Sequence, residues 1–409
     1  MDARDQGIRW SRVIGWGIYL AVSWTWCIGM FLPILLLRDF GVLGYIAFAL
    51  PNVVGAAGMG WIITSPDASR RFVERHRLAC VGFGAVTVLF HLVFVLRVVA
   101  PLNQLNGATL GAASVLLAPL LLSWFDRPRA VALITYLLSL CAVSVFVSHA
   151  WIPAPELDPA ATESFRSMRL AARDVAFLAP ACAFGFLFCP YLDLTFHRAR
   201  QGLAGVESRL GFGIGFGVFF LAMILFTIAY APVFIPSYST KYLRPPPLLL
   251  TALLLHIGAQ SAATIAFHFR ALRLPETGAI GRGSSRLLMM LAVLCAGTLL
   301  FPRLITSSVP SFADSHERLI WYRVFMSFYG LAFPGYIWLL AIPTRDGHAG
   351  PRGIRGRRKL AILFVALLLA SPCFWLGFVE RQTWWLAPGM LVILGSRLFV
   401  TPRSHRLAH

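Results

Sequence analysis

Residues 23–33 read SWTWCIGMFLP, a polar and aromatic stretch inside the first long apolar run of the chain. A helix that only had to dissolve in lipid would carry Leu, Ile, Val and Phe throughout. Here Ser, Thr and two Trp precede Gly29 and Pro33. Glycine weakens a helix through its backbone freedom and proline through the amide hydrogen it lacks. We therefore expect the first helix to be interrupted near Gly29 and to line a site.

The composition places the chain in a bilayer. Its 409 residues are 58% hydrophobic and only 13% charged, whereas soluble domains carry about 25% charged residues. The formal net charge of +19 suggests nucleic acid as a partner, but the Arg residues lie between apolar runs rather than along one face. Basic residues in such links orient a membrane protein. We therefore predict lipid, and no nucleic acid, as the surroundings of the chain.

Twelve apolar runs are long enough to span a membrane, which takes about 20 residues. The links between them are short, so residues 1–409 form a single transmembrane domain. Most Lys and Arg fall in alternate links, with the densest at 70–77 and 352–359. This bias predicts that both termini are cytoplasmic and that the protein crosses the inner (plasma) membrane many times. The runs are 13–37, 40–64, 78–100, 106–125, 129–151, 174–195, 210–234, 246–268, 287–308, 319–342, 360–379 and 382–400.

The runs divide better as five, five and two than as six and six. The first run carries GMFLP (29–33) and the sixth carries GFLFCP (185–190), so each has a Gly followed by a Pro. The run after each of these is rich in small residues, in PNVVGAAGMG (51–60) and GFGIGFGVFF (211–220), which let helices approach closely. We predict five-helix repeats at 13–151 and 174–342, opposite in orientation, and two additional helices at 360–400.

This arrangement resembles the LeuT-type fold of the amino acid–polyamine–organocation superfamily and the sodium–solute symporters. The resemblance implies a secondary transporter that works by alternating access, with helices 1 and 6 interrupted near the midplane. Backbone groups freed at such interruptions bind solute and ion. The aromatic residues suit a small organic solute. The expected substrate-binding residues are Ser23, Trp24, Thr25, Trp26, Gly29, Asn52, Gly185, Phe186 and Gln260.

The coupling ion is expected at helix 8. Ser261 and Thr264 are three residues apart and share a helix face. The resemblance implies that these hydroxyls, with Cys27 of helix 1, hold a sodium ion. The alternative is that they bond their own helix backbone. Proton coupling through Asp193 or a His is a second alternative, and no other cofactor or metal is expected.

A gating group is expected at the inner end of helix 6, where Asp193 is followed by basic residues with which it can pair. Acidic residues at membrane depth are costly and usually functional. The expected members of this group are Tyr191, Asp193, His197 and Arg198.

Two other functions stay open. In a major-facilitator transporter of six plus six helices, the link after helix 2 would carry a Gly, an Asp and basic residues, which Gly60, Asp67 and Arg70 match only with wrong spacing. A membrane-embedded acyl- or glycosyltransferase needs an acid, base or metal cluster. The sequence contains no HExxH, no GxSxG and no Asp-rich loop. We therefore expect a transporter rather than an enzyme.

Overall fold

The computed structural model describes residues 8–99, 122–123, 125–149, 161–234, 246–273, 315–343 and 350–400. Within these ranges the chain is helical, and eight helices are long and apolar enough to cross a membrane. The chain is thus a polytopic helical membrane protein, as its composition predicts. The predicted runs 106–125 and 287–308 lie almost wholly outside the described residues.

The chain begins with α1 (Trp10–Trp24) and α2 (Cys27–Ile62), and α2 is a hairpin rather than a rod. Gly41 within it has φ 63° and ψ −159°, a backbone conformation that glycine adopts at no steric cost. The Trp24 indole N–H donates to the Asn52 amide oxygen at 2.6 Å. In a straight helix Asn52 would lie about 37 Å beyond Cys27, so the chain must turn back at Gly41. The predicted runs 13–37 and 40–64 meet at this turn.

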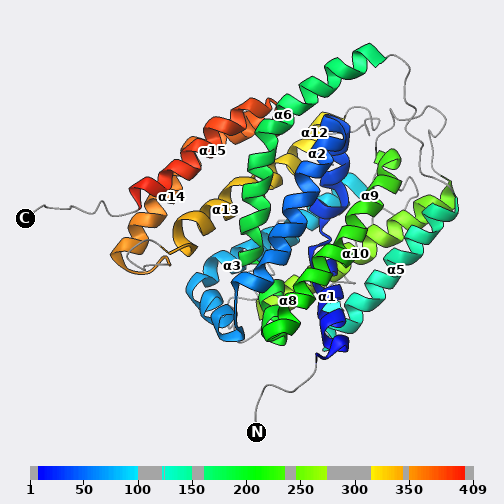
Figure 1. The fold of residues 1–409 in the computed structure, drawn as a ribbon, viewed down its shortest axis with the longest axis horizontal. Helices are drawn as coiled ribbons and strands as arrows, with labels where there is room; N and C mark the ends of the chain where they lie inside the picture. Colours follow the sequence, from blue (N-terminus) through cyan, green and yellow to red (C-terminus); the bar gives the residue numbers. More distant parts are fainter. Residues whose placement is uncertain are drawn as a thin grey trace, which may run out of the picture.

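The α2 hairpin lies across α6 (Ala161–Phe188), as the blue and green ribbons of Figure 1 show. The small residues of 51–60 make this crossing close. A Cβ on Gly55 would be 2.2 Å from the Phe186 carbonyl oxygen. Gly60 packs against a different helix, where its Cβ would be 2.6 Å from the Cβ of Phe212.

The glycines of 211–220 lie on a long helix that starts at Gly205. This helix consists of α8 (Gly205–Ile214), a π-helical turn η4 (Gly215–Phe220) and α9 (Leu221–Phe234). A Cβ on Gly215 would be 2.9 Å from the Gly17 carbonyl oxygen. The two small-residue stretches are therefore where helices meet backbone to backbone.

A second layer consists of α3 (Pro66–Phe94), the π-helical turn η1 (Val95–Val99), α5 (Pro128–Ser148) and α10 (Pro247–Arg273). The Ser65 hydroxyl accepts from the Ala68 N–H and so caps α3. Helix α10 packs against both α3 and α5 and reaches α1. This position brings the polar face of α10 to the end of α1.

The last part of the chain starts with α12 (Ser315–Ser327), which continues through η8 (Phe328–Ala332), α13 (Phe333–Tyr336) and η9 (Ile337–Ala341). The turns η8 and η9 are π-helical. Next come α14 (Gly353–Phe374), the π-helical turn η10 (Trp375–Val379) and η11 (Thr383–Trp385), followed by α15 (Leu386–Gly395) and η12 (Ser396–Phe399). Helices α14 and α15 pair at one edge of the molecule, in orange and red in Figure 1. Together with η10, η11 and η12, these two helices include most residues of the two predicted additional helices at 360–400.

Candidate functional site

The first helix is interrupted at Thr25 and Trp26, four residues before the predicted position. Both residues leave the helical conformation, with ψ 66° and 175°. The prediction of a break at Gly29 was wrong, because Gly29 and Pro33 lie inside α2. Side chains end α1 instead: the hydroxyls of Ser23 and Thr25 donate to the Leu20 and Ala21 carbonyls at 3.0 and 2.8 Å, and the Trp26 indole donates to the Ser23 carbonyl. Such bonds compete with the next helical turn.

The two tryptophans at this break are fully packed. Trp24 is hydrogen-bonded to Asn52, and its ring lies 4.8 Å from the Phe196 ring, centroid to centroid. The Trp26 ring contacts those of His268 and Tyr329, at 5.7 and 5.4 Å. The Trp24 indole and the Asn52 amide are thus hydrogen-bonded to each other. Such a bond between helices is the ordinary role of a buried amide in a membrane protein.

The second break follows α6. A 3₁₀ turn, η3 (Cys189–Leu192), leads to Asp193 in an extended conformation, and α7 (Leu194–Gly202) begins directly after it. The break therefore lies at the proline end of the predicted motif 185–190, and Gly185 itself stays helical. A Cβ on Gly185 would lie 2.7 Å from the Tyr329 carbonyl oxygen, so this glycine serves close packing.

Asp193 caps α7 and faces a histidine from another helix. Its Oδ1 accepts from the N–H and the hydroxyl of Thr195, both at 2.7 Å. Its Oδ2 lies 3.6 Å from Nε2 of His268, and neither of these two buried atoms has a hydrogen-bond partner. The His268 Nδ1 lies 2.9 Å from the Thr264 carbonyl and must donate to it. Asp193 Oδ2 and His268 Nε2 therefore face each other just beyond hydrogen-bond distance.

The expected gating group is thus arranged differently from the prediction. His197 does not pair with Asp193: its Nε2 lies 2.9 Å from the Tyr191 carbonyl and its Nδ1 lies 2.8 Å from the Ser69 hydroxyl. Arg198 has a buried nitrogen without a partner. The residue that sequence reasoning missed is His268. The signal for it was its spacing, four residues after Thr264 on the same helix face.

Helix α10 brings its hydroxyls to the first break. The Thr264 hydroxyl donates to the Val22 carbonyl at 3.1 Å, and the buried Ser261 hydroxyl has no partner. Gln260 donates instead to the Ser139 hydroxyl at 2.9 Å. The Cys27 carbonyl accepts from the Tyr322 hydroxyl at 3.0 Å. Of the expected ion-binding set, Thr264 therefore reaches a carbonyl at the end of α1.

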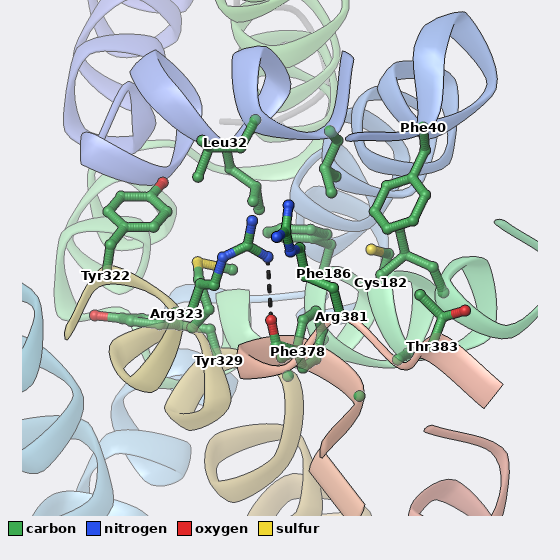
Figure 2. Close-up of a pocket in the computed structure, with 18 residues that line it drawn as sticks. Leu32, Phe40, Cys182, Phe186, Tyr322, Arg323, Tyr329, Phe378, Arg381 and Thr383 are labelled. Atoms are coloured by element: carbon green, nitrogen blue, oxygen red, sulfur yellow. Dashed lines mark hydrogen bonds between the residues drawn. The ribbon is translucent and has the colours of Figure 1, made fainter. Parts of the chain in front are cut away.

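A pocket lies between α2, α6, α12 and the segment that follows α14 (Figure 2). Gly185 and Phe186 are the expected substrate-binding residues that line it. Most of its walls are aliphatic or aromatic, and two arginines, Arg323 and Arg381, supply its charge. The lining residues are Leu32, Leu35, Leu36, Phe40, Leu178, Ala181, Cys182, Gly185, Phe186, Tyr322, Arg323, Met326, Tyr329, Gly330, Gly377, Phe378, Arg381 and Thr383.

Arginines converge on one carboxylate at the rim of the pocket. Asp39, at the end of the first half of α2, contacts Arg323 at 2.6 Å, Arg38 at 2.8 Å and Arg381 at 3.9 Å. Arg323 also donates to the Phe378 carbonyl at 3.1 Å, the dashed line of Figure 2. Sequence reasoning missed this cluster because its members come from three distant parts of the chain.

Two tyrosines separate the pocket from the first break. The Tyr322 hydroxyl donates to the Cys27 carbonyl, and the Tyr329 hydroxyl lies 3.0 Å from that of Thr87 on α3. Both rings line the pocket on one side. On the other side Tyr329 packs against Trp26. We call Tyr322 and Tyr329 the tyrosine partition.

The described residues include no group of three or more His, Cys, Asp and Glu side chains that could hold a metal ion. No protein-family model, curated protein or solved structure matches the chain. The geometry alone therefore carries the functional argument.

Proposed function

We propose that this chain is a secondary transporter, with a LeuT-type arrangement, that moves a small organic solute across the inner membrane by alternating access. The observation that carries the proposal is that two helix breaks, far apart in sequence, meet beside a pocket. The Trp24 ring packs on the Phe196 ring of α7, and Trp26 packs on His268, which faces Asp193. Broken helices that meet inside a bundle are the usual solute and ion site of secondary transporters.

The pocket and the tyrosine partition supply the access path in this proposal. Solute enters the pocket from the end of the molecule where Asp39 lies. It passes Tyr322 and Tyr329 when their hydroxyl bonds to Cys27 and Thr87 open. Non-helical backbone at membrane depth survives only where protein or water satisfies it, so the breaks at Thr25 and Asp193 are where polar groups of a solute find partners.

Two features near the breaks are suited to a coupling cation. The first is the Ser261 hydroxyl beside Thr264 and the Val22 carbonyl, where oxygen ligands suit sodium. The second is the Asp193–His268 pair, in which a buried carboxylate faces a buried imidazole at 3.6 Å. If the Ser261 site couples transport, a sodium gradient drives uptake. If the Asp193–His268 pair does, a pH gradient drives uptake.

The test is uptake of a panel of labelled amino acids, organic acids and amines into proteoliposomes, with a sodium gradient, a pH gradient or neither. We expect saturable uptake of one solute class, driven by one gradient. Thr264→Val abolishes sodium dependence if that site couples, and Asp193→Asn abolishes proton dependence if the other does. Ser144→Ala serves as the control, because this hydroxyl is exposed and bonds only within its own helix. Uptake no greater than in empty liposomes for the whole panel would refute the proposal.

A further inference from the structure

The pocket between α2, α6 and α12 carries an excess of positive charge. Three guanidinium groups, those of Arg38, Arg323 and Arg381, surround the carboxylate of Asp39. The carboxylate of Asp174 accepts from the hydroxyl of the lining residue Thr383 at 2.7 Å. No Asp or Glu side chain lines the pocket itself. A site lined by more guanidinium than carboxylate groups favours an anion.

Arg381, which lines the pocket, has an unfavourable backbone conformation. Its φ is 60°, and it is the one non-glycine residue with positive φ in the described part of the chain. A left-handed conformation is unfavourable for an L-residue with a Cβ. Strained residues of this kind cluster at ligand sites. Figure 2 shows that its guanidinium points toward that of Arg323 across the pocket.

The guanidinium of Arg381 has unused donor capacity. Its side chain is 50% exposed, and its contact with Asp39 is a long one of 3.9 Å, whereas the Arg323 side chain is 10% exposed and bonded to both Asp39 and Phe378. A guanidinium presents five N–H donors in a planar fork that matches a carboxylate. Arg381 is therefore the residue that can take a new anion, while Arg323 holds the rim in place.

The remaining walls specify the body of the ligand. Phe40, Phe186, Phe378 and the tyrosine partition give the pocket an aromatic lining. We propose that this pocket binds a small organic acid with an apolar, preferably aromatic, body and a carboxylate that pairs with Arg381. The assignment of this acid as the transported solute rests on the proposed function, but its binding does not.

The experiment measures binding to the purified full chain in detergent, so that no transport is required. The probes share one ring and differ in head group: phenylacetate, phenylacetamide and 2-phenylethylammonium. We expect phenylacetate to raise the midpoint of thermal unfolding and to bind by titration calorimetry at least 10-fold more tightly than the amide, with no binding of the cation. Equal affinity for acid and amide would overturn the proposal.

The decisive variant is Arg381→Gly, which removes the guanidinium and relieves the backbone strain at the same position. We expect it to fold at least as stably as the parent and to bind phenylacetate at least 10-fold more weakly. Arg381→Lys should keep part of the affinity, and Arg358→Gln, on the exposed surface of α14, should change nothing. Unchanged affinity in Arg381→Gly would overturn the anion site. Anion binding without uptake would overturn the transporter proposal alone, and uptake of an uncharged solute without anion binding would overturn the anion site alone.

Discussion

Two glycines on the second half of α2 offer a matched test of how closely this helix packs on α6. Gly55 and Gly58 are three residues apart in one helix. A Cβ on Gly55 would lie 2.2 Å from the Phe186 carbonyl oxygen, whereas a Cβ on Gly58 would meet nothing within 4 Å. Alanine at either site improves helix propensity by about 1 kcal/mol. The difference between the two variants therefore isolates the packing term.

The size of that term follows from the distance. Ordinary contact begins at 3.4 Å, so alanine at position 55 forces α2 and α6 apart by about an ångström. The carbonyl oxygen belongs to backbone and cannot rotate away. Overpacking of this kind costs about 1–3 kcal/mol or more, and a gap of that width also forfeits a quarter to a half of each contact it opens. We expect Gly58→Ala to be stabilised and Gly55→Ala to be less stable than Gly58→Ala by at least about 1–3 kcal/mol.

The assay is equilibrium unfolding in mixed micelles titrated with sodium dodecyl sulfate, followed by far-ultraviolet circular dichroism. Both variants are compared with the parent chain under the same micelle composition. If Gly55→Ala and Gly58→Ala have the same free energy of unfolding, α2 does not approach α6 at Phe186. The close crossing described above would then be wrong.

Further predictions use the same unfolding titration. Gly41→Ala should lose about 1–3 kcal/mol, because φ 63° with ψ −159° is a backbone conformation that is essentially restricted to glycine. No loss of stability would contradict the turn at Gly41. Trp24→Phe should cost about 1–3 kcal/mol of unfolding free energy, because the buried Asn52 oxygen loses its donor. A double-mutant cycle with Asn52→Leu should show coupling between the two substitutions. Strictly additive losses would disprove the hydrogen bond. Asp193→Ala should lose about 0.5–2 kcal/mol through the lost cap on Thr195, and Asp193→Asn should keep most of the cap.

The class of the fold could be predicted because it depends on composition and run length alone. The presence of an interruption in the first and sixth runs was also correct, but both breaks lie elsewhere than the glycines. Gly and Pro lower helix stability locally, yet a helix ends where side chains satisfy its last carbonyls. At the first break Ser23, Thr25 and Trp26 do this. These residues belong to the same stretch, 23–33, but the position of the break follows from their side-chain hydrogen bonds and not from the glycine and proline after them.

The site was predicted less well because its contacts are not local. Asp39 lies far from Arg323 and Arg381 in the sequence. Each of the three by itself is only a charged residue near the end of an apolar run. His268 likewise gains its meaning only from Asp193 across the bundle. Single-sequence patterns give faces of helices, whereas the pairing of those faces is set by the tertiary structure. The positive φ at Arg381 has no sequence signal, because arginine is not a residue type that favours the left-handed conformation.

The π-helical turn η8 has a consequence for how the tyrosine partition can move. A π-helical turn contains one residue more than an α-helical turn. The extra residue can change its position along the helix in steps of one residue. Each step changes the angular position of the residues it passes by about 100°. Because Tyr329 lies inside η8 and Tyr322 lies before it, a short shift of the surplus residue would swing one ring while its neighbour stays in place. In the transport cycle that we propose, the pocket would thus open toward the first break by rotation within one helix, without separation of the surrounding bundle.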